Sequence, residues 1–174
     1  RTIYFQSNRR DRFGIFSKAA DGSGIEQFLP IGGCDTLNDG PQSIPRDRKL
    51  FLFNRQAEKT GYDLWAVPLT PEQNQGKLEP RIFLQTAFNE QFAKFSPDGL
   101  WVAYQSNESG QDEVYAAPFP GPGGKRLIST GGGNHPRWRP DGKELFYATS
   151  DGQLMAVEVA ARNGTLEVGR GQKL

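Results

Sequence analysis

Short apolar segments alternate with polar turns along the whole chain. The clearest example is the stretch 95–115, which reads FSPDGLWVAYQSNESGQDEVY. It contains a tight turn, an apolar strand, a second polar turn and the beginning of another strand. Pro97 and Gly99 favour the first turn, because proline pre-sets one turn dihedral and glycine tolerates positive φ. No segment shows a sustained 3.6-residue period, so we predict no substantial helix.

The pattern of this stretch recurs along the chain, which indicates internal repeats. In each copy an aromatic residue ends the same apolar strand, at Phe5, Phe53, Tyr104 and Tyr147. An aspartate stands six residues before three of these aromatic residues, at Asp47, Asp98 and Asp141. The aromatic residues are 48, 51 and 43 residues apart, which divides the chain into units at about 1–34, 35–86, 87–130 and 131–174.

Each unit is interpreted as a set of short strands. In the third unit the strands lie at about 91–95, 100–105, 113–118 and 125–129. Four-stranded units with a period of ~40–50 residues are typical of β-propeller blades. We therefore predict an all-β fold, a β-propeller that is partial or has about four blades, with four antiparallel strands per blade. An open arc, a four-blade ring and part of a larger ring all remain open, and exposed end blades would favour self-association.

The second unit departs from the pattern at its first turn. Where the third and fourth units have Pro-Asp-Gly, this unit reads Pro-Arg-Asp-Arg-Lys at 45–49. The proline has moved by one position and the glycine is absent, so we expect a different turn at this point.

The last two units carry a family resemblance. FSPDG at 95–99 is followed by WVAY at 101–104, and WRPDG at 138–142 is followed by ELFY at 144–147. These segments resemble the repeats of TolB-type, WD-repeat-like bacterial β-propellers. The resemblance covers nearly the whole chain and is weaker in the first two units. It implies a module that binds a protein or a small ligand.

A narrower resemblance runs from 88 to 159. The segments YAAPFPGPGGK at 115–125 and STGGG at 129–133 look like the propeller region of large bacterial proteins in which a Ser/Thr kinase domain precedes a membrane segment. The resemblance implies a sensor or interaction module outside the cytoplasm, on the periplasmic or cell-surface side of a membrane-anchored parent. The kinase motifs themselves are absent from this sequence.

Composition excludes several other classes of function. The chain has 174 residues, enough for one domain with a hydrophobic core, and its 21 basic and 20 acidic residues give a net charge of +1. Such a chain has no field to attract nucleic acid, and no apolar run approaches the ~20 residues that span a bilayer. The chain opens inside a strand-like run and its one methionine is Met155, so we expect it to be part of a longer protein.

Catalytic and metal-binding chemistry is weakly represented. His135 is the one histidine, and no Gly-x-Ser-x-Gly motif occurs, so we predict no catalytic residue. Cys34 is the one cysteine, which excludes an internal disulfide, and no basic residue adjoins it to lower the thiol pKa. The loop with Asp35, Asn38 and Asp39 lacks the spacing of a calcium loop, so we predict no metal and no cofactor.

The candidate binding site is inferred from the position of its residues in the repeat. Loops that enter the inner strands of a propeller lie at the same end of its central channel, where converging polar groups form a default binding-site hypothesis. The candidate residues on this rim and the adjoining strands are Asp35, Asn38, Asp39, Asn89, Glu90, Lys94, Asn134, His135 and Arg137. The alternative is that they are only solvated loop residues. A basic turn with Arg9, Arg10 and Arg12 is a solvated edge or pairs with an acidic turn of another molecule.

Two functions therefore remain. One is a non-catalytic sensor or protein-interaction propeller that is part of a larger signalling protein. The other is the gating propeller of a prolyl-oligopeptidase-like serine hydrolase, whose catalytic domain is not in this chain. The domain that accompanies the propeller in the parent gene distinguishes the two.

Overall fold

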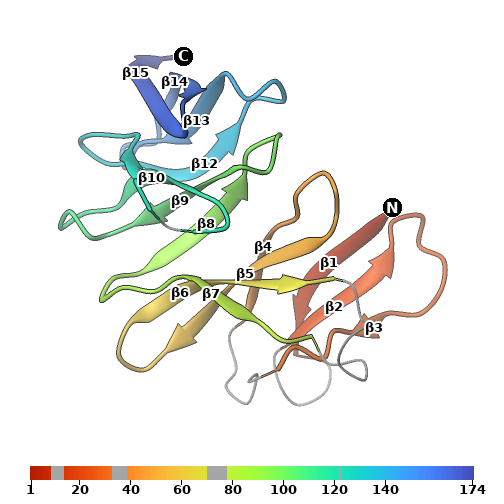
Figure 1. The fold of residues 1–174 in the computed structure, drawn as a ribbon. Coiled ribbons are helices and arrows are strands. Elements are labelled where there is room, and N and C mark those ends of the chain that lie inside the picture. The colour runs from red at the N-terminus through yellow and green to blue at the C-terminus, as the bar shows by residue number, and fades with distance from the viewer. Residues whose placement is uncertain (9–13, 33–38, 70–77, 122) are drawn as a thin grey trace.

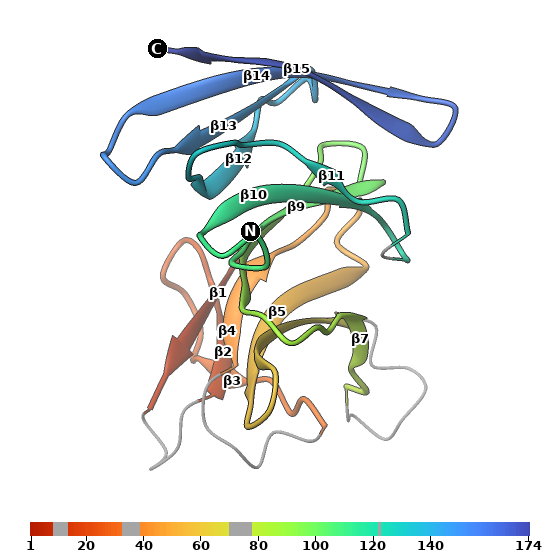
Figure 2. The same cartoon turned by 90° about the vertical axis from the view of Figure 1, so that its left-hand side faces the viewer.

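The fold consists of antiparallel sheets arranged as an open arc (Figure 1). A computed structural model describes residues 1–8, 14–32, 39–69, 78–121 and 123–174. Over these residues the chain forms fifteen strands and no helix. The first and last sheets lie at opposite ends of the arc in both views (Figures 1 and 2). The predicted all-β propeller architecture is confirmed.

We number the sheets as blades in chain order. Blade 1 contains β1 (Thr2–Ser7), β2 (Gly14–Ala19) and β3 (Gln27–Phe28). Blade 2 contains β4 (Gly40–Ser43), β5 (Leu50–Ala57), β6 (Gly61–Pro68) and β7 (Arg81–Leu84). Blade 3 contains β8 (Glu90–Phe95), β9 (Trp101–Ser106), β10 (Glu113–Pro118) and β11 (Arg126–Leu127). Blade 4 contains β12 (Asn134–Trp138), β13 (Glu144–Ala148), β14 (Leu154–Arg162) and β15 (Thr165–Lys173).

The strand register relates the blades to one another. The repeated aromatic residues stand opposite residues of the following strand, in the pairs Phe5–Phe16, Phe53–Trp65, Tyr104–Tyr115 and Tyr147–Met155. β1 is therefore the equivalent of β5, β9 and β13, the second strands of the other blades. The first strands, β4, β8 and β12, contact one another in sequence along the inner side of the arc. Blade 1 has no described strand at this inner position.

Hydrophobic clusters fill the spaces between adjoining blades. Tyr104 of blade 3 packs in one cluster with Leu52 and Leu64 of blade 2. Tyr147 of blade 4 packs in another with Trp101 and Ala103 of blade 3. Phe53 of blade 2 packs likewise in a cluster with Ile15 of blade 1, so the repeated aromatic side chains of blades 2, 3 and 4 pack against the preceding blade. Full burial of side chains of this size contributes roughly 1.5–3 kcal/mol each, so stacking of the blades supplies most of the core.

The turns between first and second strands are alike in three blades. Gly99 and Gly142 both have a φ of 76°, and the Gly142 N–H donates to the Arg139 carbonyl at 2.9 Å. In blade 2 the Arg48 N–H donates to the Pro45 carbonyl at 3.0 Å, and Arg48 itself has a φ of 57°. The expectation of a different turn in the second unit is therefore wrong. Arginine adopts the glycine conformation there, at a cost of about 1–2 kcal/mol.

These turns converge at one end of the inner strands. The guanidinium of Arg46 in blade 2 donates a hydrogen bond of 2.9 Å to the carbonyl of Pro140 in blade 4. Two blades that do not adjoin are therefore connected at this end. The loops that precede the inner strands lie at the opposite end, where sequence reasoning places the binding rim.

Candidate functional site

The inner strands carry an irregularity at equivalent positions. The register shifts between Gln91 and Lys94 in β8 and between Asn134 and Arg137 in β12. Within these bulges Phe92 has a φ of 55° and His135 a φ of 53°, and their ring centroids are 4.0 Å apart. Non-glycine residues with positive φ cost of order 1–3 kcal/mol and occur preferentially at ligand-binding sites. The two strained residues therefore mark a candidate ligand-binding site on the inner edge.

Side chains of neighbouring blades cap the exposed backbone of this edge. The Ala93 N–H of β8 donates to Oε1 of Gln42 in β4 at 3.0 Å. The indole N–H of Trp138 in β12 donates to the Lys94 carbonyl of β8 at 3.0 Å. Unpaired backbone groups at a sheet edge are costly when buried, so these contacts stabilise the arc as well as its inner surface.

Two cations lie at equivalent positions of neighbouring inner strands. The Lys94 ammonium donates to the carbonyl of Gln42, and burial, with the nearby charge of Arg137, lowers the pKa of Lys94 to about 8. The Arg137 guanidinium donates to the Pro136 carbonyl at 2.8 Å. Neither cation forms an ion pair with a described carboxylate. We call Phe92, Lys94, His135 and Arg137 the inner-edge cluster.

Asp39 of the predicted rim forms a buried ion pair within blade 2. It is 5% exposed, and Arg55 of β5 contacts it with Nε at 2.9 Å and a terminal guanidinium nitrogen at 2.8 Å. The guanidinium also lies 5.1 Å from the Phe53 ring and 5.0 Å from the Trp65 ring. Asp39 therefore connects β4 to β5 and points into the blade.

Glu90 occupies the same position in blade 3, but its partner differs. Ser106 stands opposite Glu90, where blade 2 has Arg55. Glu90 is 0% exposed; Thr86 donates to its Oε1 at 2.5 Å, and its Oε2 has no hydrogen-bond partner among the described residues. Burial raises the pKa of Glu90 to about 7, and the charge of Asp63 adds to this effect. Glu90 is thus a buried carboxyl without a cation.

The remaining rim residues divide into two groups. The Asn89 side chain accepts the Tyr62 N–H at 3.1 Å, so it connects blade 3 to blade 2. Asn134 lies beside His135, with 3.0 Å between its Oδ1 and the His135 Nδ1. Asp35 and Asn38 lie outside the described residues, as do Cys34 and the basic turn with Arg9, Arg10 and Arg12.

The structure thus brings together a subset of the predicted site. Lys94, Asn134, His135 and Arg137 share the inner edge, whereas Asp39, Asn89 and Glu90 are directed into or between blades. Sequence reasoning missed Phe92, because an aromatic residue two positions before Lys94 reads as core. The position of Phe92 in the repeat, which is equivalent to that of His135, could have identified it as a candidate.

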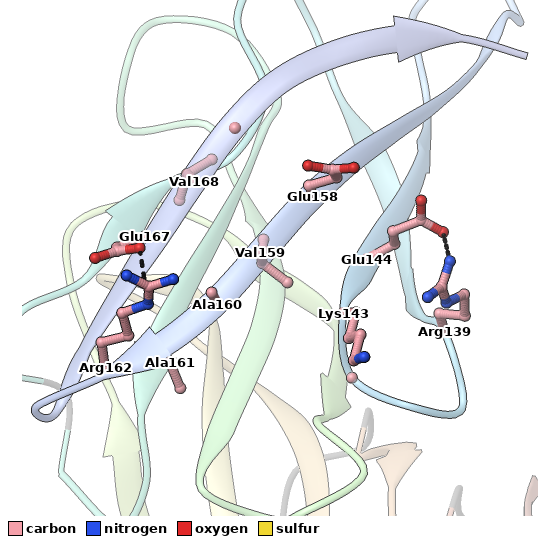
Figure 3. Close-up of a pocket in the computed structure, with 12 residues that line it drawn as sticks. Arg139, Lys143, Glu144, Glu158, Val159, Ala160, Ala161, Arg162, Glu167 and Val168 are labelled. Atoms are coloured by element: carbon pink, nitrogen blue, oxygen red, sulfur yellow. Dashed lines mark hydrogen bonds and ion pairs between the residues drawn. The ribbon is translucent and has the colours of Figure 1, made fainter.

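Another groove lies on blade 4, lined by residues of β14 and β15 and of the turn that precedes β13 (Figure 3). It has a volume of about 680 Å³, and Val159 and Ala160 lie among its charged side chains. Four of those charges form two ion pairs: Arg139 lies 2.6 Å from Glu144, and Arg162 lies 3.4 Å from Glu167. Lys143 and Glu158 also line the groove.

The geometry around His135 does not resemble a hydrolytic site. Its ring contacts Phe92, and its Nδ1 lies 3.0 Å from the amide oxygen of Asn134. Among the described residues no serine hydroxyl is hydrogen-bonded to it, and no group of three or more His, Cys, Asp or Glu side chains is placed to hold a metal ion. The described segments also contain no helix long and apolar enough to cross a membrane.

Comparisons with known proteins show the fold. No protein-family model matches the chain, and no curated protein matches it. Among solved structures, a chain described as TolB from Agrobacterium tumefaciens is similar with a TM-score of 0.73 and 14% identity, over 99% of this chain and 62% of that one. A chain of the nidogen/laminin complex is similar with a TM-score of 0.67 and 10% identity, over 96% of this chain and 59% of that one.

An enzyme also occurs among the similar structures. A puromycin-hydrolyzing peptidase of Mycobacterium tuberculosis has a TM-score of 0.59 and 14% identity, over 95% of this chain and 30% of that one. This chain therefore spans between 30% and 62% of the length of these three structures. At such identities the likeness shows a TolB-like propeller fold, shared by binding proteins and by parts of enzymes.

Proposed function

We propose that this chain is a non-catalytic binding or sensor module, a TolB-like propeller that recognises a protein or a small ligand through its inner edge. The observation that carries the proposal is the inner-edge cluster. It combines two strained residues, Phe92 and His135, with two cations that no described carboxylate neutralises. Strain and uncompensated charge both cost stability, and binding of a ligand offsets such costs.

A protein partner is the more specific form of this proposal. The nidogen/laminin complex is named for an assembly of proteins, and one of its chains has this fold. The resemblance of 115–133 to propellers of membrane-anchored kinase-like proteins supports a sensor on the periplasmic or cell-surface side, within a larger signalling protein. A tagged full-length parent, fractionated and probed for protease accessibility in intact cells, tests this location; protection of the propeller by the cytoplasmic membrane would contradict it.

The inner-edge cluster can be tested by ligand selection. Short random peptides displayed on phage are selected on the immobilised chain, with a Lys94→Ser/Arg137→Ser variant as the counter-selection target. Serine is the residue that blade 2 has at this position, Ser43, so the change copies a natural state of the repeat. Enrichment of peptides that prefer the unmodified chain supports the proposal. Equal recovery from both proteins would overturn it.

A gating propeller of a serine hydrolase is the second candidate, and the similarity to the puromycin-hydrolyzing peptidase favours it. In that case the parent gene would carry an α/β-hydrolase domain with a Gly-x-Ser-x-Gly motif. The sequence of the parent gene decides between the candidates. A kinase and a membrane helix beside the propeller support the sensor, whereas a hydrolase domain supports the gate.

Self-association through the end blades is a further part of the proposal. Ile3 of blade 1 is 51% exposed on the face that packs against a preceding blade elsewhere, and Leu154 of blade 4 is 50% exposed. Apolar residues at both ends of an arc favour contact between copies. Light scattering over a range of concentrations measures this directly. A particle that stays monomeric at the highest concentration would contradict it.

A further inference from the structure

Lys94 lies on β8, the middle one of the three described first strands (Figure 1). β4 adjoins β8 on one side, and β12 adjoins it on the other. The Lys94 ammonium donates to the Gln42 carbonyl of β4, and the Lys94 carbonyl accepts the indole N–H of Trp138 in β12 at 3.0 Å. The strands on both sides of this lysine are therefore described, and they can be searched for a negative charge.

These strands offer no carboxylate to Lys94. β4 contains no ionisable residue, and β12 contains His135 and Arg137. The one acidic residue of β8 is Glu90, which is 0% exposed and directed between the blades. The three inner strands thus present cations and no exposed carboxylate. Because the whole chain has a net charge of only +1, this concentration of positive charge is local.

The two cations are close enough to affect each other. Burial, together with the charge of Arg137, lowers the pKa of Lys94 to about 8. A carboxylate between two like charges would replace their repulsion by two attractions. One terminal nitrogen of the Arg137 guanidinium donates to the Pro136 carbonyl at 2.8 Å, and its other donors have no partner among the described residues. A guanidinium presents a planar fork of N–H groups that matches both oxygens of a carboxylate.

The backbone donors of β8 are already occupied. Phosphate sites are typically built from successive backbone N–H groups. Here the Ala93 N–H donates to the Gln42 side chain at 3.0 Å, and the Phe95 N–H donates to the Ser43 hydroxyl at 3.1 Å. This edge therefore offers side-chain cations to an anion, which suits a carboxylate better than a phosphate group.

The surroundings of the cations favour a polypeptide over a small acid. His135 and Arg137 are both exposed, so the cluster is not an enclosed pocket that would bury most of a small molecule. The Phe92 and His135 rings lie 4.0 Å apart and adjoin the cations on the same two strands. An apolar side chain beside the carboxylate would contact the exposed His135 ring. A peptide segment can supply both groups at once.

We propose that the inner-edge cluster binds the carboxylate of an Asp or Glu side chain in an extended segment of a partner protein. Lys94 and Arg137 contact the carboxylate, and the Phe92–His135 pair contacts an apolar residue beside it. This inference rests on the proposed function, because it names the chemistry of the ligand that the same site takes.

The probe is the peptide acetyl-Gly-Phe-Glu-Phe-Gly-amide, in which phenylalanine on both sides of the carboxylate suits either direction of the chain. His135 is the one histidine, so its imidazole proton resonances report binding at the cluster directly. The matched peptide with Gln in place of Glu is expected to bind about five- to tenfold more weakly. The peptide acetyl-Gly-Phe-Gln-Phe with a free C-terminus presents its carboxylate at a chain end. Tighter binding of this peptide than of the Glu peptide would contradict the side-chain assignment.

The pH dependence of binding tests the contact with Lys94. A bound carboxylate favours the charged lysine, so binding takes up a proton wherever free Lys94 is neutral. Because the pKa of Lys94 is about 8, the affinity is expected to fall about three- to tenfold between pH 7 and pH 9. The Glu of the peptide stays ionised over this range. Lys94→Arg keeps its charge at both pH values and is expected to remove most of the fall.

The control variant and the selection experiment separate the possible failures. Lys143→Ser/Arg170→Ser removes two exposed cations of blade 4 and is expected to leave the affinity for the Glu peptide unchanged. Equal affinity for the Glu and Gln peptides would overturn the inference, as would unchanged His135 resonances at about 10 mM peptide. Selected phage peptides that prefer the unmodified chain but lack Asp and Glu would overturn it while the proposed function stands. Selection without any such preference would overturn both.

Discussion

Replacement of Glu90 by glutamine should stabilise the protein above neutral pH. Glu90 is 0% exposed, its Oε2 has no partner among the described residues, and burial raises its pKa from 4.5 to about 7. A glutamine of nearly the same shape keeps the hydrogen bond from Thr86 and carries no charge. The matched position in blade 2, Asp39, has a cation and serves as the control.

The sign and size of the effect follow from proton linkage. Between pH 4.5 and about 7 folded Glu90 binds more protons than unfolded Glu90, so its contribution to stability falls as the pH rises through this window. The displacement of the pKa corresponds to about 3 kcal/mol once both states are ionised, and we expect ~1–3 kcal/mol after relaxation of the site. Below pH 4.5 the carboxyl is protonated in both states and the effect vanishes.

Urea unfolding at a series of pH values measures this contribution. At pH 8 the free energy of unfolding of Glu90→Gln is expected to exceed that of the unmodified chain by about 1–3 kcal/mol, which corresponds to a rise in Tm of roughly 2–12 °C. Near pH 4.5 the two free energies of unfolding are expected to match. Asp39→Asn is expected to be destabilising at each pH, because it removes the charge that lies 2.8 Å from the buried Arg55 guanidinium. A Glu90→Gln variant that is destabilised by the same amount at every pH would refute the reasoning.

Three further substitutions test the scaffold. Arg48→Gly should raise the free energy of unfolding by about 1 kcal/mol, because Arg48 has a φ of 57°; an unchanged urea midpoint would contradict the strain. Tyr104→Phe should change stability by less than about 1 kcal/mol in either direction, since the buried hydroxyl has no hydrogen-bond partner among the described residues; a larger loss would reveal one. Ser129→Ala should cost about 1–3 kcal/mol in thermal unfolding, because its hydroxyl accepts the Val114 N–H at 2.7 Å in the core; a neutral effect would show that the contact is dispensable.

The architecture is predictable from sequence because the repeat is expressed in local chemistry. Apolar alternation, the Pro-Asp-Gly turns and the aromatic column each specify part of a blade, and Tyr104 pairs with Tyr115 as the aligned copies imply. The turn at Arg48 was mispredicted because an exposed arginine adopts a φ of 57°, where a glycine is usual. The Lys49 N–H donates to Oδ1 of Asp47 at 3.1 Å, as the Lys143 N–H does to Asp141, so the turn keeps its aspartate contact without the usual proline and glycine.

The candidate site was less predictable. Polar residues near the inner strands could be identified from the repeat, but the direction of each side chain depends on the bulges, which no residue type specifies. The register shift between Gln91 and Lys94 brings Phe92 against His135. Asp39 and Glu90 occupy one position in the repeat, yet the partner across the strand, Arg55 or Ser106, decides whether the carboxylate is neutralised.

The most direct test of the central claim is the dissociation constant of a selected ligand for two double variants of equal charge. Lys94→Ser/Arg137→Ser removes the cations of the inner-edge cluster, and Lys143→Ser/Arg170→Ser removes two exposed cations of blade 4. Calorimetric titration should show binding at least about tenfold weaker for the first variant, equivalent to about 1.4 kcal/mol, and unchanged for the second. Equal weakening of both variants would mean that net charge, and not the inner edge, determines binding.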